Sequence, residues 1–138
     1  ENGMPSRHDA HKANVEHRLL ASIDLIDAST ACVLLRIETD DPEGVIRAMV
    51  GKDAIMTLVQ NGRTMVPLFQ FDRASGRVFD VVLDLLKLRP SRMSNLRLAY
   101  WLTRAHVDLG CPPAHRFGHD DATIVAAFRR YIEPEHHG

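Results

Sequence analysis

The residues of this 138-residue chain that could carry chemistry are its histidines, its two cysteines and its arginines. His8 and His11 have the spacing of a metal-binding pair, and Cys111 precedes His115 by four residues. A zinc site needs four converging ligands, and no second pair with a suitable spacing stands out. A cysteine nucleophile needs a base that a third group orients, but Pro112-Pro113 intervenes and no orienting Asn or Asp is evident. We therefore expect no metal, no cofactor and no enzymatic activity.

The arginines are concentrated in the second half of the chain. Eight cations and only three acids lie between residues 73 and 116, which gives this stretch a net charge of +5. Such a run is most often a solvated helix face, but it also suits an acidic partner or a phosphate. Arg89, Arg92 and Arg97 bracket a loop and a helix start, where the helix dipole also favours anions.

The composition is that of an ordinary globular protein, with 45% hydrophobic residues, 25% charged residues and a net charge of −1. Its length suits one domain or two small lobes with a buried core. No apolar run reaches the roughly 18 residues of a membrane helix. Two cysteines indicate reduced thiols rather than a disulfide scaffold. We expect a cytoplasmic protein with no membrane partner.

A predicted hairpin marks the middle of the chain, between residues 55 and 72. Asn61-Gly62 separates two apolar runs, and both central residues of a type I′ turn need a positive φ. Pro67 removes a hydrogen-bond donor, so the second strand should end there or lie at a sheet edge. Strand alternation places Phe69 and Phe71 on one face and Gln70 on the other. A lone hairpin is barely stable, so helices must pack against it.

Apolar stripes and capping residues predict helices on both sides of the hairpin. The stripe from Val15 to Ile26 predicts the first helix, after a loose polar segment at residues 4–12. The other predicted helices are residues 31–36 after Ser29-Thr30, residues 42–50 with Asp41 as the N-cap and Pro42 in the first turn, residues 78–89, a helix capped by Ser94 with Leu98, Trp101 and Leu102 inward, and a helix capped by Asp120 that stops before Pro134.

The order of predicted elements over residues 16–70 is that of a winged helix-turn-helix domain, whose third helix enters the major groove of DNA. Candidate DNA contacts are Arg47, Lys52 and Arg63. A helix that approaches phosphates should be basic. Residues 37–54 instead contain five acids and two cations, a net charge of −3. The charge therefore favours packing or protein contact over base reading by this helix.

The stretch from Gly62 to Asp72, followed by Gly76-Arg77 and an apolar helix, resembles the entry to the toxin-binding domain of Xre/MbcA/ParS-type antitoxins. Those domains continue with a helix that ends in Trp-Leu, a loop with Leu-Gly and Pro, and a final helix. This chain has Trp101-Leu102, Leu109-Gly110 and a last apolar stretch in the same order. The resemblance covers about residues 55–130 and extends more weakly upstream.

The resemblance implies a bacterial antitoxin that forms a homodimer. In that family the toxin-binding domain covers the active site of a RES-domain toxin, an enzyme that consumes NAD. The N-terminal part commonly binds the promoter of its own operon. The chain departs from the family after Leu109-Gly110, where Pro113 to Phe117 replaces a Pro-Ile/Val-Asp/Glu-Leu-Leu pattern.

A protein that acts by binding needs a few anchors at the centre of its interface, typically Trp, Tyr or Arg. The candidate partner-binding residues are Trp101, Arg104, Arg129, Arg130 and Tyr131, together with the tail that follows. Three of them have a structural alternative: Trp101 is more often a core residue, and Arg129 and Arg130 can offset the dipole at a helix C-terminus.

The predicted fold is mainly α, with helical lobes and one β-hairpin. We divide it into a disordered or tag-like segment at 1–14, a degenerate winged helix-turn-helix-like part at 15–72 and an antitoxin-type helical part at 73–138. The expected function is binding and inhibition of a cognate toxin. A DNA-binding transcriptional regulator and a protein-binding adaptor unrelated to toxins are the alternatives.

Overall fold

The computed structural model describes residues 7–133 and has a mixed architecture. It is 54% helical, with six α-helices and small antiparallel sheets. Residues 1–6 of the expected disordered or tag-like segment 1–14, and residues 134–138 of the expected binding tail 132–138, lie outside the described residues. None of the helices within residues 7–133 is long and apolar enough to cross a membrane.

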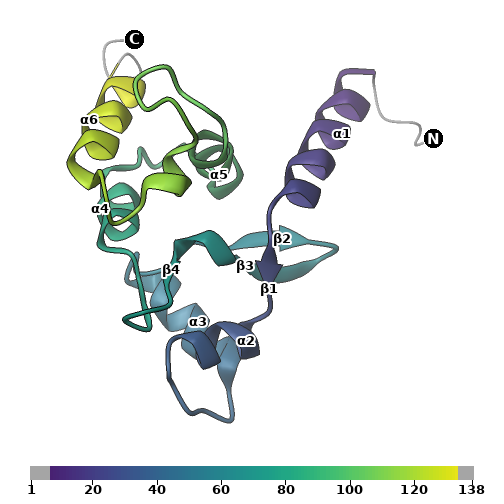
Figure 1. Ribbon diagram of the computed structural model, residues 1–138. Coiled ribbons are helices and arrows are strands. Elements are labelled where there is room, and N and C mark those ends of the chain that lie inside the picture. Colours follow the sequence, from purple (N-terminus) through teal and green to yellow (C-terminus); the bar gives the residue numbers. More distant parts are fainter. Residues whose placement is uncertain (1–6, 134–138) are drawn as a thin grey trace.

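The first helix, α1 (Arg7–Ser22), projects away from the rest of the molecule (Figure 1). It begins at Arg7, although the polarity of the sequence indicated a loose segment over residues 4–12. Polarity was a poor guide because residues 7–22 contain no Gly or Pro, so nothing in them opposes a helix. At its C-terminal end Leu19 and Leu20 are half-buried, and Ile23 beyond it is buried in the core.

Two short helices follow the short strand β1 (Leu25–Ile26). Helix α2 (Ala28–Leu34) begins earlier than predicted, because Asp27 rather than Ser29 or Thr30 is its N-cap. The Asp27 carboxylate accepts a hydrogen bond of 2.8 Å from the backbone N–H of Thr30. This bond lowers the pKa of Asp27.

Helix α3 (Pro42–Gly51) agrees with its prediction. Asp41 is the N-cap and accepts a hydrogen bond of 3.1 Å from the backbone N–H of Gly44. Pro42 occupies the first turn, where its missing N–H costs no hydrogen bond.

The central hairpin is confirmed, with strands β2 (Leu58–Gln60) and β3 (Arg63–Pro67). Asn61 and Gly62 have φ angles of 53° and 76°, as a type I′ turn requires. Strand β3 ends at Pro67, as predicted. It lies in the middle of a three-stranded antiparallel sheet with the order β1-β3-β2, so the alternative of an edge strand is not realised.

The expected alternation of Phe69, Gln70 and Phe71 does not occur. A single 3₁₀ turn, η1 (Leu68–Gln70), interrupts the extended chain before β4 (Phe71–Asp72) pairs with β5 (Arg77–Val78). This turn places Gln70 entirely inside the protein. The polar residue that a strand would have placed opposite the two phenylalanines is therefore part of the core.

The second half of the chain contains α4 (Asp80–Leu88), α5 (Asn95–Thr103), η2 (Pro113–Arg116) and α6 (Asp121–Ile132). Ser94 caps α5 as predicted, by accepting a hydrogen bond of 3.0 Å from the Arg97 N–H. Asp120 stands at the N-cap of α6 but makes no capping bond, because its carboxylate pairs with Arg116.

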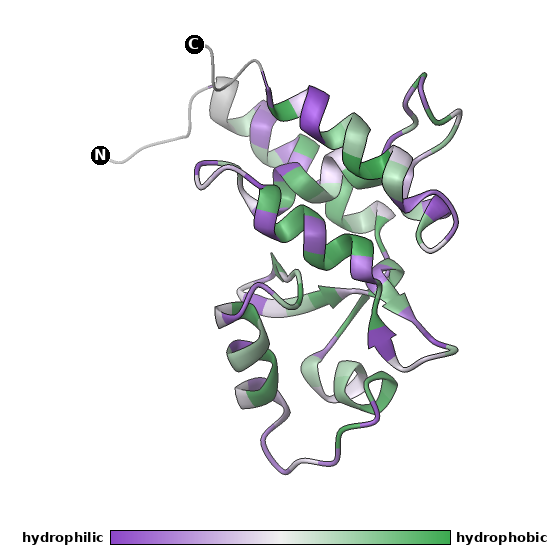
Figure 2. Ribbon diagram, turned by 90° about the vertical axis from the view of Figure 1, so that its left-hand side faces the viewer, coloured by the Kyte–Doolittle hydropathy of each residue, from purple (hydrophilic) through white to green (hydrophobic). Residues whose placement is uncertain are grey.

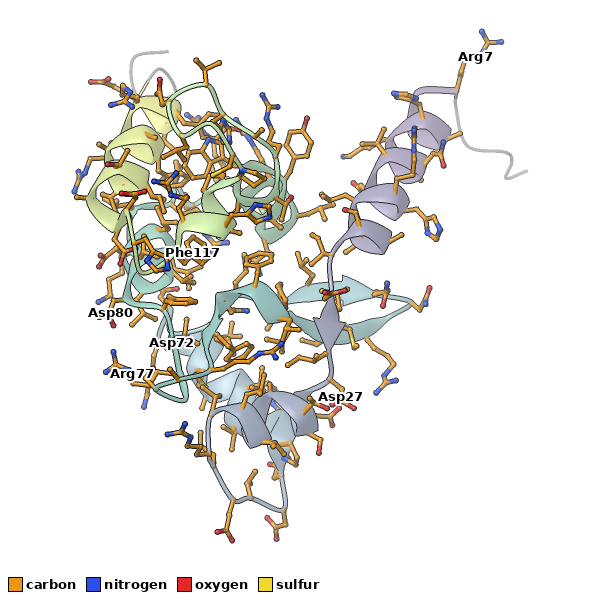
Figure 3. All side chains as sticks on the ribbon, viewed as in Figure 1. Arg7, Asp27, Asp72, Arg77, Asp80 and Phe117 are labelled. Atoms are coloured by element: carbon orange, nitrogen blue, oxygen red, sulfur yellow. The ribbon has the colours of Figure 1, made fainter. Side chains whose placement is uncertain are left out.

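Buried apolar residues on both sides of residue 73 belong to one core cluster. Hydrophobic residues accordingly occur in both the upper and the lower part of the molecule in Figure 2. Phe117, labelled in Figure 3, lies where the C-terminal helices meet the segment around β4. Its ring centroid is 6.2 Å from that of Phe69 and 5.7 Å from that of Phe79. This core supports the surface residues of α5 and α6.

Candidate protein-binding surface

Trp101 is buried beneath the candidate surface and does not itself form part of it. Only 3% of the residue is exposed. Its ring centroid lies 5.1 Å from that of Phe128, 5.8 Å from that of Tyr131 and 4.8 Å from that of His106. Trp101 is therefore a core residue, the structural alternative considered for it from the sequence. Its contacts with Phe128 and Tyr131 hold α5 against α6 and orient the Tyr131 side chain.

Tyr131 packs on the Trp101 ring, and Arg97 packs on Tyr131. Tyr131 is half-buried, and its hydroxyl accepts a hydrogen bond of 3.2 Å from Nε of Arg97. The Arg97 guanidinium carbon is also 5.5 Å from the centre of the Tyr131 ring, a distance suited to a cation–π contact. A cation is thus held on an aromatic face that joins α5 to α6.

Tyr100 and Arg104 form a second pair of this kind at the end of α5. Tyr100 is 44% exposed, and the Arg104 guanidinium carbon lies 5.1 Å from the centre of its ring. Nη1 of Arg104 also donates a hydrogen bond of 3.0 Å to the Tyr100 hydroxyl. Each side chain restricts the other, so less conformational entropy is lost when a partner binds them.

Arg130 connects α6 to the loop that follows α5. Its Nη2 lies 2.8 Å from a carboxylate oxygen of Asp108, and more than half of each side chain is exposed. An exposed ion pair of this kind contributes little to stability, typically about 0–1 kcal/mol. Both groups are therefore free to exchange partners in an interface at little cost.

Arg129 lies elsewhere. It borders two adjoining hollows beside α4 and α6, together with residues such as Asp84, Val125 and Leu88. Arg130 lines the second of these hollows as well. Of the other predicted residues, Trp101 contacts Tyr131, Arg104 pairs with Tyr100, and Arg130 pairs with Asp108.

We define the α5–α6 surface as Arg97, Tyr100, Arg104, Asp108, Arg130 and Tyr131. Its three arginines and one aspartate give a net charge of +2. The sequence-based selection omitted Tyr100 and Arg97, although the spacing of residues 97, 100 and 104 places them along one side of α5. The surface presents no nucleophile beside a base. Its cations and aromatic rings are suited to binding carboxylates and apolar groups.

A second candidate site is a groove of about 670 Å³ between α3 and the β2–β3 hairpin. Arg47 and Arg63 both line it, so the structure unites two of the three predicted DNA-contacting residues. Lys52 is the C-cap of α3 and is not part of the lining. Glu43 also lines the groove and reduces its positive charge.

Cys111, the cysteine considered as a nucleophile, hydrogen-bonds with Arg116. This hydrogen bond, and after it the charge of Asp120, raises the pKa of Arg116. Within residues 7–133, no group of three or more His, Cys, Asp or Glu residues is placed to hold a metal ion.

Comparison with models of protein families, with characterised proteins and with solved structures finds no match for this chain. The antitoxin hypothesis therefore depends on the motifs in the sequence and on the geometry of the α5–α6 surface. Trp101-Leu102 and Leu109-Gly110, two of those motifs, lie in the elements that build this surface.

Proposed function

We propose that this chain is a non-catalytic binding protein of the antitoxin type, which inhibits a partner enzyme by covering its active site. The observation that carries the proposal is the presence of two arginine–tyrosine pairs on α5 and α6: the Tyr100–Arg104 pair, and the Arg97–Tyr131 pair, whose tyrosine packs on buried Trp101. Tyrosine and arginine are the residue types enriched where protein interfaces are strongest. The resemblance to Xre/MbcA/ParS-type antitoxins supplies the partner, an NAD-consuming enzyme with a RES domain.

Inhibition by coverage requires only affinity and rigidity. The two arginine–tyrosine pairs are ordered before binding, so more of the interaction free energy appears as affinity. The net charge of +2 on the surface favours a partner with an acidic face. No proton transfer or bond formation by this chain is needed.

The proposal predicts that a RES-type enzyme is encoded beside this gene, and the test uses that enzyme. The two proteins should co-purify, and the chain should suppress NAD consumption by the enzyme. The double substitution Tyr100→Ala and Arg104→Ala should weaken both effects by at least about tenfold. Arg63→Ala, which removes an exposed arginine from the distant hairpin, is the matched control and should leave them unchanged. A neighbouring enzyme that neither binds the chain nor is inhibited by it would contradict the proposal.

Promoter DNA is a second candidate partner. The element order α1-β1-α2-α3-β2-β3 and the sheet order β1-β3-β2 support a winged helix-turn-helix, with α3 as the recognition helix and β2–β3 as the wing. Arg47 and Arg63 on one groove support phosphate contacts, whereas the net charge of −3 over residues 37–54 opposes them.

A mobility-shift titration tests whether the two arginines outweigh the negative charge of residues 37–54 and allow DNA binding. A DNA-binding regulator should prefer the upstream promoter over a scrambled sequence, with an affinity that falls steeply with salt. Arg47→Ala combined with Arg63→Ala should reduce both the affinity and the salt slope. Equal binding to the two sequences would reject this candidate.

A homodimer is the proposed assembly, and α1 is the element available to form it. Val15 on this helix is 40% exposed, and the N-terminal half of α1 stands clear of the core (Figure 1). Gel filtration with light scattering should give twice the mass of the chain, and Val15→Asp should shift the protein towards a monomer. A monomer at high concentration would exclude this assembly.

An adaptor with a partner unrelated to toxins is the remaining alternative. It predicts that the α5–α6 surface captures a protein from native lysate that is not encoded beside this gene. Capture that is lost with Tyr100→Ala and Arg104→Ala would favour this alternative over the antitoxin proposal.

A further inference from the structure

Val107 is the most exposed large hydrophobic residue of the described chain, with an exposed fraction of 100%. It lies in the loop between α5 and η2, directly before Asp108 of the α5–α6 surface. An isolated exposed valine needs no explanation when it lies on a flexible loop. Here the loop around it is closely held.

Backbone hydrogen bonds close the loop into a tight turn beneath Val107. The carbonyl of His106 accepts hydrogen bonds from the N–H groups of Leu109 and Gly110, at 3.1 and 2.8 Å. His106 also forms an antiparallel bridge with Cys111. Gly110 has a φ of 72°, a conformation that glycine adopts without strain and that lets the chain reverse here.

Side chains on either side of Val107 anchor this turn to the core. The His106 ring packs against Trp101, and its Nε2 lies 2.8 Å from the Trp101 carbonyl oxygen. Leu109 is buried, and Asp108 pairs with Arg130 on α6. His106 and Leu109 thus fix the turn to the body of the protein, while the Val107 side chain is exposed to solvent.

We propose that Val107 is the apolar anchor of the α5–α6 surface and inserts into a hydrophobic pocket of the partner protein that is rimmed by carboxylates. When an apolar side chain is already held by a rigid turn, little loop entropy is lost on binding, so most of the free energy of its burial contributes to affinity. Arg104 precedes Val107 by three positions, and Asp108, the next residue, pairs with Arg130. These three charged residues have a net charge of +1, so the rim of the pocket should be acidic. This inference rests on the proposed function, which it extends by describing the complementary site.

The test measures, by isothermal titration calorimetry, the affinity of the full chain for the RES-type enzyme that the proposed function predicts beside this gene. Val107→Ala should weaken binding by about tenfold, since it removes two buried carbon atoms. Val107→Asp should weaken it by at least about a hundredfold, because a carboxylate would enter an apolar, acid-rimmed pocket. Val33→Asp, at a site on α2 that is 72% exposed, is the matched control and should bind like the wild type.

The outcomes separate this inference from the proposed function. If Tyr100→Ala with Arg104→Ala weakens binding while both Val107 variants bind normally, Val107 is not the anchor and the proposed function stands. If the wild-type chain does not bind the enzyme, the proposed function fails and the inference fails with it. Circular dichroism spectra identical to that of the wild type establish that the Val107 variants remain folded. A tenfold loss for Val107→Ala alone supports the anchor.

Discussion

The Gln70 side chain pairs with both backbone polar groups of Met56 inside the core. Its Oε1 accepts a hydrogen bond of 2.9 Å from the Met56 N–H, and its Nε2 donates bonds to the carbonyls of Met56 and Pro67, at 2.8 and 3.1 Å. Both residues are fully buried. One side chain thus satisfies the backbone where the chain enters β2 and where it leaves β3.

Replacement of Gln70 by leucine should therefore destabilise the protein by about 3 kcal/mol, because three buried backbone groups lose their partner. Urea denaturation followed by circular dichroism measures this change. Gln60→Leu is the matched control, since the Gln60 side chain makes no hydrogen bond within the described structure. The expected change for the control is within about 0.5 kcal/mol. If the two substitutions lowered the free energy of unfolding equally, the hydrogen bonds of Gln70 would make no specific contribution to stability.

The turn between β4 and β5 should not tolerate a side chain at Gly76. This residue has a φ of 72°, and an added Cβ would lie 2.8 Å from Nε of Arg36. Gly62 has a similar φ of 76° but open space around it. Gly62→Ala should cost about 1 kcal/mol for the positive φ alone. We expect Gly76→Ala to cost more in thermal or urea denaturation.

The extra cost at Gly76 should depend on Arg36. The Arg36 guanidinium donates hydrogen bonds to the carbonyls of residues 73, 74 and 75, so it must move aside for a new Cβ. In an Arg36→Ala background, the costs of Gly76→Ala and Gly62→Ala should become similar. A double-mutant cycle with no coupling between Arg36 and Gly76 would disprove this explanation.

The Asp27 cap should make the stability of α2 depend on pH. Hydrogen bonding to the Thr30 N–H lowers the pKa of Asp27 in the folded state. Its contribution is therefore complete above the unfolded aspartate pKa of about 3.9 and is lost as the pH falls through the lower folded value. Asp27→Ala should destabilise the protein by about 1 kcal/mol at pH 7.

Denaturation at several pH values tests this prediction. The difference between the wild type and Asp27→Ala should shrink below pH 4. Asp24→Ala, which removes an exposed carboxylate three residues earlier, should show no comparable difference at any pH. A constant difference between pH 7 and pH 2 would mean that Asp27 does not act through its charged form.

The two cysteines should differ in reactivity. Cys32 is 3% exposed, and burial raises the pKa of its thiol, so little nucleophilic thiolate forms. Cys111 is partly exposed at the edge of the turn that carries Val107. Iodoacetamide at pH 8 should modify Cys111 at least about tenfold faster than Cys32, as measured by mass spectrometry. Equal rates in 8 M urea are the control, and equal rates in the folded protein would contradict the burial of Cys32.

Some elements of this fold follow from residues that are neighbours in the chain. Asn61-Gly62 predicted the hairpin turn, Asp41 with Pro42 predicted the start of α3, and Ser94 predicted the start of α5. In each case the determining interaction spans four residues or fewer, so the sequence contains everything that the geometry needs. The apolar stripes of α4 and α6 were equally legible, because the period of a helix is a local property.

Burial was decided by residues that are distant in the chain. No local pattern placed Gln70 in the core, because its partner Met56 lies fourteen positions earlier and η1 interrupts the strand between them. The helix over residues 7–14 was missed for a different reason, since its polarity indicated a loose segment.

In the candidate surface, too, some features follow from the sequence alone and others depend on residues that are distant in the chain. The sequence by itself determined which residue types were available near the C-terminus, the cations and aromatic rings that suit protein binding. Only the tertiary structure decided that Trp101 packs against Tyr131, that Arg129 lines a hollow beside α4, and that Val107 is fully exposed on a closed turn. The reason is physical: chemical type is a property of one residue, whereas exposure depends on how α5, α6 and the loop between them pack together.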